Sequence, residues 1–473
     1  MPTSTIPSPT VVAETGAASP GWTRRRVLVV TYDFPPSPWM GAQACAQIAR
    51  YLPLYGWEPV VLTIRERHVE ERDVPGARAF RGAVIRTGVL PHPLTLYRRV
   101  KASLSRPIRG AQEGGDPVAR MGTVRRGLLS LLSIPDACAG WIPPAVVAGL
   151  GAIRAHRVEH IFSSGPHSTN HLVGLALARM TGLPWTAHFR DPWVYPAALW
   201  RQVKPVSALS ARIETALERM VVHRATAVAC VTGQHASWLR QTYPDLPPGK
   251  FVTIPNGFDG GEWETLVGET DRSHSVSRDT FVISYAGNLY HRRSPLPLFR
   301  ALGSLIHAGE IARERVRVDL IGHCDVAEGA RVAETAAACG LAGCVNVTGP
   351  LSRAEALRRV ARSDLLLLLA EGLMFQIPGK TYEYLRAGRP ILALTSEGAV
   401  ADLLRRAGGA WVVDPADEAA VRGALRDAYC SWKDGLEPPG PDPDLVAAFD
   451  RRVLVGRLAR LFETAAASGR AAR

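Results

Sequence analysis

The chain has 473 residues, of which 47% are hydrophobic, so its length and composition favour two or more domains with well-formed cores. No stretch approaches roughly 18 uninterrupted apolar residues, and we therefore expect no transmembrane helix. The net charge of +13 suits phosphorylated substrates, anionic lipid or nucleic acid, although a general bias toward arginine would produce the same charge.

The N-terminus and the cysteines indicate a cellular compartment. Residues 1–20 are rich in Ser, Thr, Pro and Ala and lack the basic start and apolar run of a secretory signal, so residues 1–22 are expected to be a disordered tail. The seven cysteines are scattered and form no C-x-x-C pair, which argues against a disulfide framework or a structural metal. Reduced thiols, most of them in the core, are typical of a cytoplasmic protein.

The first elements follow the order strand, helix, strand. An apolar strand at 27–31 precedes a helical pattern at 44–55 and a second strand at 59–63, which is typical of a doubly wound parallel sheet. No G-x-G-x-x-G opens the helix, which argues against a dinucleotide-binding oxidoreductase. Later strands of the same sheet are expected at 160–163, 185–189 and 227–232.

Residues 92–135 interrupt this pattern. Eight cations between positions 98 and 126 are accompanied by two acidic residues, and the apolar run GLLSLLSI follows at 127–134. A basic segment beside an apolar one can lie on an anionic membrane surface. A solvated loop followed by a core helix is the simpler interpretation. The segment is the candidate contact for an acceptor or for the inner face of a membrane.

A second α/β domain is expected after a polar linker at 266–279. Its strand at 364–369 lies in the run DLLLLLA, which is nearly all apolar, as expected for a strand buried on both faces. Residues 434–445 are expected to form a loop, and residues 446–465 a helix. The remaining strands of this domain are expected at 281–286, 316–321, 345–348 and 391–394.

The segment QIPGKTYEYLRAGRPI at 376–391 joins a Pro-Gly turn, a short helix and a strand. A helix that opens at Gly379 presents free N–H groups and the positive end of its dipole, which favour an anion. Lys380 and Glu383 are three residues apart and share a helix face. A cation suits a pyrophosphate, and a carboxylate suits the vicinal hydroxyls of a ribose. The segment therefore predicts a nucleoside diphosphate site, with an ordinary βα unit as the alternative.

A second cluster is YAGNLYHRRSP at 285–295, where a strand ends. Gly287 allows the backbone to approach a ligand closely. Arg292 and Arg293 follow in the loop, and a guanidinium matches the oxygens of a phosphate. The alternative is that both are solvated loop arginines.

A third cluster is LPWTAHFRDPW at 183–193, which places His188, Arg190 and Asp191 at the carboxyl end of a strand. Open α/β sheets bind their ligands at this edge. His188 is a candidate for hydrogen bonding to a transferred group or an acceptor, with a structural histidine as the alternative. Arg190 and Asp191 are candidates on the same side, or an ion pair that shapes the loop.

The segments 27–63, 183–193 and 376–391 together resemble retaining glycosyltransferases of family 4, and they occur in the order typical of that family. The resemblance runs from about residue 27 to about residue 413. It implies the GT-B fold, in which two Rossmann-like doubly wound domains enclose an interdomain cleft. The implied domains are an acceptor-side domain at 23–268, joined by the helix at 446–465, and a donor-binding domain at 280–433.

The resemblance also implies roles for single residues. Glu383 matches the ribose-binding carboxylate of the family, and Arg293 (with Arg292 as the alternative) and Lys380 would stabilise the departing diphosphate. Gly41, in the loop PPSPWMGA, would approach the diphosphate from the first domain.

On the acceptor side, His167 in SSGPHSTNH is a candidate. The chain departs from the family at Phe375, where relatives often carry a second Glu. The loop at 373–378 would then offer backbone amides to the sugar or phosphate. No D-x-D sequence at a strand end and no pair of carboxylates stands out, so we expect neither a metal nor a cofactor.

The function expected from these features is transfer of a hexosyl group from a nucleoside diphosphate sugar, with UDP or GDP as the nucleotide, to a hydroxyl acceptor with retention of configuration. Acceptors of relatives include polysaccharides, glycolipids and natural products. A sugar-nucleotide epimerase on the same fold is one alternative. A basic protein that binds membrane or nucleic acid is the other, and the absence of a nucleic-acid-binding motif makes nucleic acid the least favoured partner.

Overall fold

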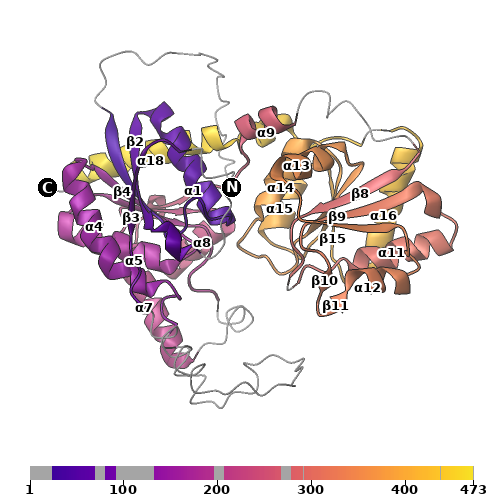
Figure 1. The fold of residues 1–473 in the computed structure, drawn as a ribbon, viewed down its shortest axis with the longest axis horizontal. Coiled ribbons are helices and arrows are strands. Elements are labelled where there is room, and N and C mark those ends of the chain that lie inside the picture. The colour runs from indigo at the N-terminus through magenta and orange to yellow at the C-terminus, as the bar shows by residue number, and fades with distance from the viewer. Residues whose placement is uncertain are drawn as a thin grey trace.

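The computed structural model describes residues 24–69, 80–91, 131, 133–196, 207–267, 279–290, 292–436 and 438–471. These residues form two α/β domains side by side, the first indigo to magenta and the second pink to orange (Figure 1). Each domain is built on one large parallel sheet. In the described ranges, no helix has the length and apolar character needed to span a membrane.

The first domain contains a seven-stranded sheet in the order β3-β2-β1-β4-β5-β6-β7. Successive residues of its central strand β1 point to opposite faces. Leu28 and Val30 pack in one core cluster, while Val27 and Val29 pack in another. The strands are β1 (Arg25–Val30), β2 (Trp57–Ile64), β3 (Ala83–Thr87), β4 (His160–Ser164), β5 (Trp185–Phe189), β6 (Ala227–Cys230) and β7 (Phe251–Thr253). The helices are α1 (Met40–Tyr51), α4 (Ile142–Ala155), α5 (Ser168–Thr181), α7 (Ala208–Arg224) and α8 (Gly233–Thr242).

The second domain contains a six-stranded sheet in the order β12-β9-β8-β13-β14-β15. Strand β13 is buried on both faces, because its leucines alternate between two core clusters. The strands are β8 (Phe281–Ala286), β9 (Val316–Ile321), β12 (Val345–Gly349), β13 (Leu365–Leu369), β14 (Ile391–Leu394) and β15 (Ala410–Val413), with a small hairpin of β10 (Val326–Ala327) and β11 (Ala330–Arg331). The helices are α11 (Leu296–His307), α12 (Val332–Ala338), α13 (Arg353–Arg362), α14 (Gly379–Ala387), α15 (Ala399–Ala407) and α16 (Glu418–Lys433).

Short 3-10 helices complete the described secondary structure. They are η1 (Leu52–Tyr55), η2 (Glu66–His68), η4 (Ala139–Trp141), η5 (Pro248–Lys250) and η6 (Arg313–Arg315). The helix expected at 44–55 is divided in this way, because α1 ends at Tyr51 and the chain tightens into η1 around Pro53.

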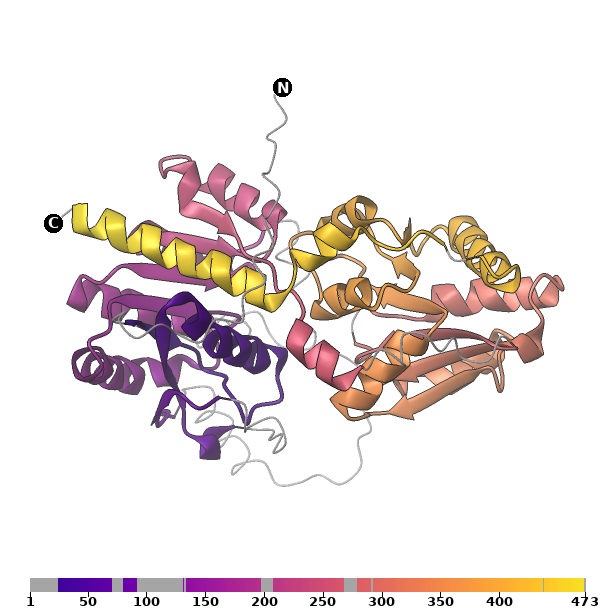
Figure 2. The ribbon, with the colours of Figure 1, turned by 90° about the horizontal axis from the view of Figure 1, so that it is seen from above.

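The two connections between the domains lie side by side. The N–H of Phe258 donates to the carbonyl of Phe449 over 3.1 Å, and the N–H of Arg451 donates to the carbonyl of Phe258 over 2.8 Å. After this crossing, α18 (Arg451–Ala471) packs on the first domain as the long yellow helix of Figure 2. The expected return of the C-terminal helix is therefore observed, although it begins at Arg451 rather than at 446.

Two short helices next to the crossing belong to the second domain. Trp263 and Val267, in and directly after α9 (Gly260–Leu266), pack in a core cluster of that domain, as does Val446 of α17 (Pro443–Ala447). The boundary expected at residue 268 is corrected accordingly. The physical reason is that the large apolar surface of Trp263 is buried in a cluster with residues of the second domain, whereas a sequence pattern does not reveal which core will cover it.

Most strands expected from the sequence are observed at the expected places, within one to two residues. Strands β3, β7 and β15 were not expected. They are short, and β3 and β15 are only half-buried, so their sequences lack the strong apolar signal of central strands. The expected tail at 1–22, the cations between 98 and 126, and most of the expected linker lie outside the described residues.

Candidate active site

Three residues singled out by sequence come together around Tyr285, near the end of β8. Nζ of Lys380 lies 3.8 Å from the centroid of the Tyr285 ring. The charge of Arg293 acts on the Tyr285 hydroxyl, and its guanidinium carbon lies 4.0 Å from the centroid of the Tyr290 ring. Gly287 has a φ of +134°, and a Cβ there would collide with Nζ of Lys380. Gly287 is therefore required for the close approach of this lysine to the strand end.

The environment of Lys380 favours the binding of an anion. Its Nζ is buried and has no hydrogen-bond partner among the described residues. Burial, and secondarily the charge of Arg293, lowers the pKa of Lys380 to about 7. A buried ammonium without a counter-charge is unfavourable, and a nearby anion would restore its ordinary protonation. The position thus favours a negatively charged ligand.

The N-terminus of α14 in the second domain lies close to the N-terminus of α1 in the first domain. Helix α14 begins at Gly379, and its N-cap residue Pro378 makes no side-chain cap. A Cβ at Gly379 would lie 3.1 Å from Cε of Met40, the first residue of α1 in the other domain. The N-cap of α1, Trp39, makes no side-chain cap either. Uncapped first turns present N–H groups and a positive dipole end, the elements of an anion site.

Arg190 lies beside Gly41 on the first-domain side of this place. A Cβ at Gly41 would be 3.3 Å from Nη1 of Arg190, and Nε of Arg190 donates to Oδ1 of Asn256 over 3.2 Å. Asp191 instead accepts a hydrogen bond from Gln376 of the second domain. Arg190 and Asp191 thus have separate partners, and the ion pair that the sequence left open is not formed between them.

His188 lies inside the first domain. Its side chain is 3% exposed, Nδ1 is 3.1 Å from Oγ of Ser164, and the ring stacks on Phe162. Burial, reinforced by the charge of Arg190, lowers the pKa of His188 to about 3, so the imidazole is neutral at physiological pH. This geometry fits the structural alternative for His188, and its role toward a transferred group or an acceptor stays a prediction.

Arg292 separates from Arg293, although they are adjacent in sequence. It has a left-handed backbone with φ of +60°, and its Nη1 would be 2.5 Å from a Cβ at Gly372. It therefore lies against the loop after β13, whereas Arg293 lies with Lys380. Of the two arginines, the structure brings only Arg293 to the cluster around Tyr285.

Glu383 has a partner that sequence reasoning missed. Arg353, the first residue of α13, donates from Nη2 to Glu383 over 2.7 Å. The same guanidinium binds both carboxylate oxygens of Glu262 in α9, each over 2.9 Å. Arg353 therefore orients the carboxylate of Glu383. No local signal could reveal this, because Arg353 is 91 residues from Glu262 and 30 residues from Glu383.

Phe375, which replaces the second Glu of the family, makes an interdomain contact. Its side chain is 7% exposed, and its carbonyl accepts a hydrogen bond from Oγ1 of Thr232 over 2.7 Å. Its ring lies 6.1 Å from the rings of both His235 and Trp238 in the first domain. The loop after β13 is thus held against the first domain in part by the apolar side chain of Phe375.

His167, the acceptor-side candidate, follows β4 and has partners at both ring nitrogens. Nε2 is 2.9 Å from Oδ2 of Asp33, and Nδ1 is 3.5 Å from Sγ of Cys138. Its side chain is 30% exposed, so it reaches the surface at the carboxyl edge of the first sheet. The site residues carried by the first domain, His167 and Arg190, thus lie at the sheet edge expected for them.

Comparison with known proteins agrees with this architecture. Residues 113–260 match the model of Glycosyltransferase Family 4, and residues 280–430 match the model of Glycosyl transferases group 1. No curated protein sequence matches the chain significantly.

Solved structures share the fold at low sequence identity. Sucrose-phosphate synthase from Thermosynechococcus elongatus is 15% identical, with a TM-score of 0.63 over 94% of this chain and 100% of that chain. HepE from Anabaena, in complex with UDP and glucose, is 14% identical, with a TM-score of 0.57 over 93% of this chain and 100% of that chain. A Listeria monocytogenes protein described as a candidate UDP-N-acetylglucosamine 2-epimerase is 13% identical, with a TM-score of 0.52 over 92% of this chain and 95% of that chain. With two glycosyltransferase matches and two parallel sheets, this chain is a glycosyltransferase of the GT-B fold, with a first domain that matches Glycosyltransferase Family 4 and a second that matches Glycosyl transferases group 1.

Proposed function

We propose that this glycosyltransferase moves a hexosyl group from a UDP- or GDP-sugar to a hydroxyl acceptor, with retention of configuration. The proposed acceptor is a polysaccharide, a glycolipid or a natural product. HepE, which shares the fold, binds UDP and glucose, which supports a nucleoside diphosphate sugar as the donor. The family 4 match of the first domain supports the assignment of that domain to the acceptor side.

The observation that carries this proposal is the convergence of positive groups between the domains. Lys380 and Arg293 lie around Tyr285, and the uncapped start of α14 lies next to Met40 at the start of α1. Arg190 adds a further cation beside Gly41. A diphosphate is an anion of suitable size for such a place, and Glu383, on the same helix as Lys380, would bind the ribose hydroxyls.

In the proposed reaction, the bond between the anomeric carbon and the diphosphate breaks, and the acceptor oxygen forms a bond to that carbon. Negative charge develops on the departing diphosphate. Lys380, Arg293 and the first-turn N–H groups of α14 are already in place to stabilise it, which lowers the barrier because they need little reorganisation. These groups supply the charge that a metal supplies elsewhere, so we propose that donor binding requires no metal ion.

Thermal denaturation with a panel of UDP-, GDP-, dTDP- and ADP-sugars and free nucleoside diphosphates tests the donor site. A ligand that binds only the folded state raises the Tm. We expect a shift with a uridine or guanosine nucleotide, unchanged by EDTA and reduced in Glu383→Ala. Nuclear magnetic resonance of the glycosylated product reports retention. A flat panel across all nucleotides would overturn the proposal.

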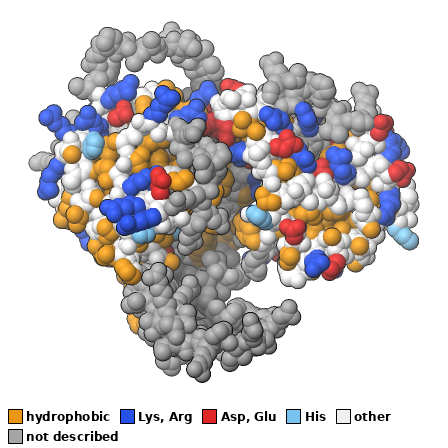
Figure 3. Space-filling view, in the orientation of Figure 1, with side chains coloured by type: hydrophobic (Ala, Val, Ile, Leu, Met, Phe, Trp, Pro, Cys, Tyr) orange, Lys and Arg blue, Asp and Glu red, His pale blue; other side chains and the backbone are white. Residues whose placement is uncertain are grey.

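The epimerase alternative rests on the shared fold alone. It predicts that a sugar nucleotide changes its sugar without any acceptor, whereas the transferase consumes donor in proportion to glycosylated acceptor. A basic binding protein would instead show steeply salt-dependent binding without nucleotide affinity. On the face drawn in Figure 3, basic side chains are scattered over both lobes among acidic and hydrophobic ones.

We further propose that the enzyme is cytoplasmic and peripheral at the inner membrane face. The support is the sequence of residues 92–134, in which cations precede an apolar run. Sedimentation with vesicles that contain anionic lipid, compared with neutral vesicles, tests the contact. Equal binding to the two kinds of vesicle would contradict it.

A further inference from the structure

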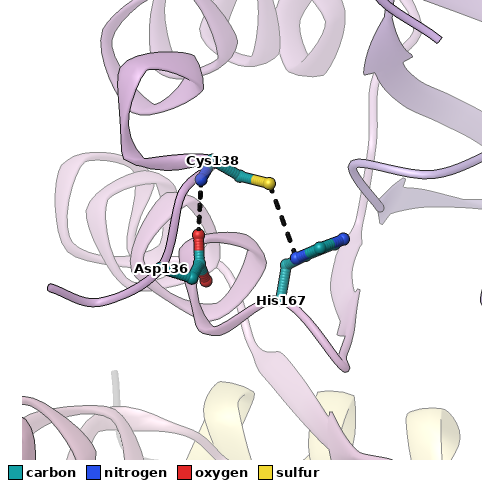
Figure 4. Close-up of side chains that lie close together, drawn as sticks. All are labelled: Asp136, Cys138 and His167. Atoms are coloured by element: carbon teal, nitrogen blue, oxygen red, sulfur yellow. Dashed lines mark hydrogen bonds between the residues drawn. The ribbon is translucent and has the colours of Figure 1, made fainter. Parts of the chain in front are cut away.

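A group of potential metal ligands lies outside the donor site, on the first domain. Asp136, Cys138 and His167 each offer one ligand atom, and these atoms all lie within 4.8 Å of one another (Figure 4). They come from two segments: Asp136 and Cys138 precede η4, and His167 lies between β4 and α5. The glycosyl transfer described above uses neither Cys138 nor Asp136.

The spacing of the sulfur and nitrogen ligands suits a tetrahedral ion. Sγ of Cys138 is 3.5 Å from Nδ1 of His167. With a Zn–S bond of about 2.3 Å and a Zn–N bond of about 2.0 Å, two ligand atoms of a tetrahedral zinc ion lie about 3.5 Å apart. The thiol and the imidazole thus already have the separation that such an ion requires.

The orientation of His167 is set by a carboxylate. Its other ring nitrogen, Nε2, donates to Oδ2 of Asp33 over 2.9 Å. A histidine that binds a metal through one nitrogen usually donates the other N–H to a carboxylate, which fixes the ring and strengthens the ligand. Asp33 therefore has the position of such an orienting group, and Nδ1 is directed to Cys138.

The carboxylate of Asp136 is held in place but retains one acceptor position. Oδ1 accepts from the N–H of Cys138 over 2.9 Å and from Oγ1 of Thr169 over 2.6 Å. Among the residues that the structure describes, Oδ2 accepts one hydrogen bond, from the N–H of Thr169 over 2.9 Å. A carboxylate oxygen has two lone pairs, so Oδ2 has one left for a cation.

We propose that Asp136, Cys138 and His167 bind a zinc ion at the acceptor-side edge of the first domain. Thiolate and imidazole ligands favour zinc over magnesium or calcium, which prefer oxygen. Zinc binds a thiolate and a neutral imidazole nitrogen, so the proton of the Cys138 thiol, and any proton on Nδ1, is released to solvent when the ion binds. Three protein ligands leave a fourth position for water.

Such an ion would join loops that are far apart in sequence. Asp33 follows β1 in the loop that leads to Gly41, whereas His167 follows β4. A zinc ion would fix both loops to the segment before α4, next to the place where an acceptor would bind. The ion is distinct from the donor site, so its loss would leave nucleoside diphosphate binding intact.

Cobalt titration tests the site without any need for activity. Protein freed of metal by a chelator is titrated with Co²⁺, which takes the place of zinc and gives a thiolate-to-cobalt charge-transfer band when a cysteine is a ligand. We expect one equivalent of Co²⁺, displaced by Zn²⁺. The band is lost in Cys138→Ser and in His167→Asn, and it persists in Cys430→Ser, which changes an exposed cysteine. Asp33→Asn weakens binding by about 10–100-fold.

A nucleotide-induced rise in Tm verifies that each variant is folded. The absence of a charge-transfer band in the wild-type protein would overturn the proposal, whether or not the variants fold. A band that survives in Cys138→Ser would overturn it as well.

Discussion

The proposed donor side, on the second domain, and the proposed acceptor side, on the first, differ in how their polar groups are assembled. On the donor side, Gly379, Lys380 and Glu383 are carried by one turn of α14, and Arg293 follows the adjacent strand β8. On the acceptor side, His167 depends on Asp33 and Cys138, which are 134 and 29 residues away. Groups on one helix form a motif that the sequence reveals, whereas a site built from separate loops can be identified only in the folded structure.

The largest effect on catalysis is expected for substitution of Lys380, and this substitution tests most directly how the proposed donor side is organised. Lys380→Ala removes the buried cation next to the diphosphate, and loss of one preorganised charge of this kind lowers kcat by about 100–1000-fold. Steady-state kinetics with the identified donor measures the loss. Lys433→Ala, at an exposed lysine that ends α16, is the matched control. Wild-type turnover in Lys380→Ala would show that the donor side is not organised around this residue.

The next largest effect on kcat is expected for Arg293, and its neighbour Arg292 provides the matched control. Arg293→Ala removes a cation from the Lys380 cluster, and we expect kcat to fall by about 10–100-fold, because a charge-assisted hydrogen bond is weakened or lost. Arg292→Ala removes a side chain that contacts the Gly372 loop, and little change in kcat is expected. The two rates relative to wild type test the assignment. Reversed effects would mean that the loop rearranges when the donor binds.

Arg353 tests whether the donor side also depends on distant residues. Glu383→Gln and Arg353→Ala should each weaken the binding of a nucleoside diphosphate by about tenfold, because each disturbs hydrogen bonds to a charged carboxylate. The fold loss of affinity in the double variant should be smaller than the product of the two single fold losses, as expected for interacting residues. Calorimetric titration measures these affinities. Inorganic pyrophosphate, which lacks a ribose, should bind the wild type and the variants equally, and an equal loss for both ligands would contradict the role of Glu383.

A smaller, graded effect is expected with pH. The pKa of Lys380 in the free protein is lowered to about 7, and a bound diphosphate raises it. Below pH 7 both states are protonated, so this group leaves affinity unchanged. Above pH 7 the free protein loses the proton that the complex retains, and the Kd rises by at most about tenfold per pH unit. Calorimetry at pH 8 in buffers of different ionisation enthalpy should detect proton uptake, which Lys380→Ala abolishes.

The sequence predicted the donor-side residues because each lies next to a recognisable strand or helix end. Gly287 lies against Lys380, and the collision that a Cβ at Gly287 would cause explains the glycine. His188 also lies at a strand end, which the sequence indicates, but its burial depends on how loops fold over the sheet.

By itself, the sequence determined the two α/β domains, the order of most strands and the start of α14 at Gly379, since these follow from local apolar patterns and turn residues. The tertiary structure alone decided which residues that are distant in the sequence contact one another. It joined Arg353 to Glu383, placed α9 in the second domain, and turned Phe375 toward Thr232 of the first. Local patterns depend on neighbours in the chain, whereas ion pairs and core contacts depend on which distant segments the packing of the two sheets brings together.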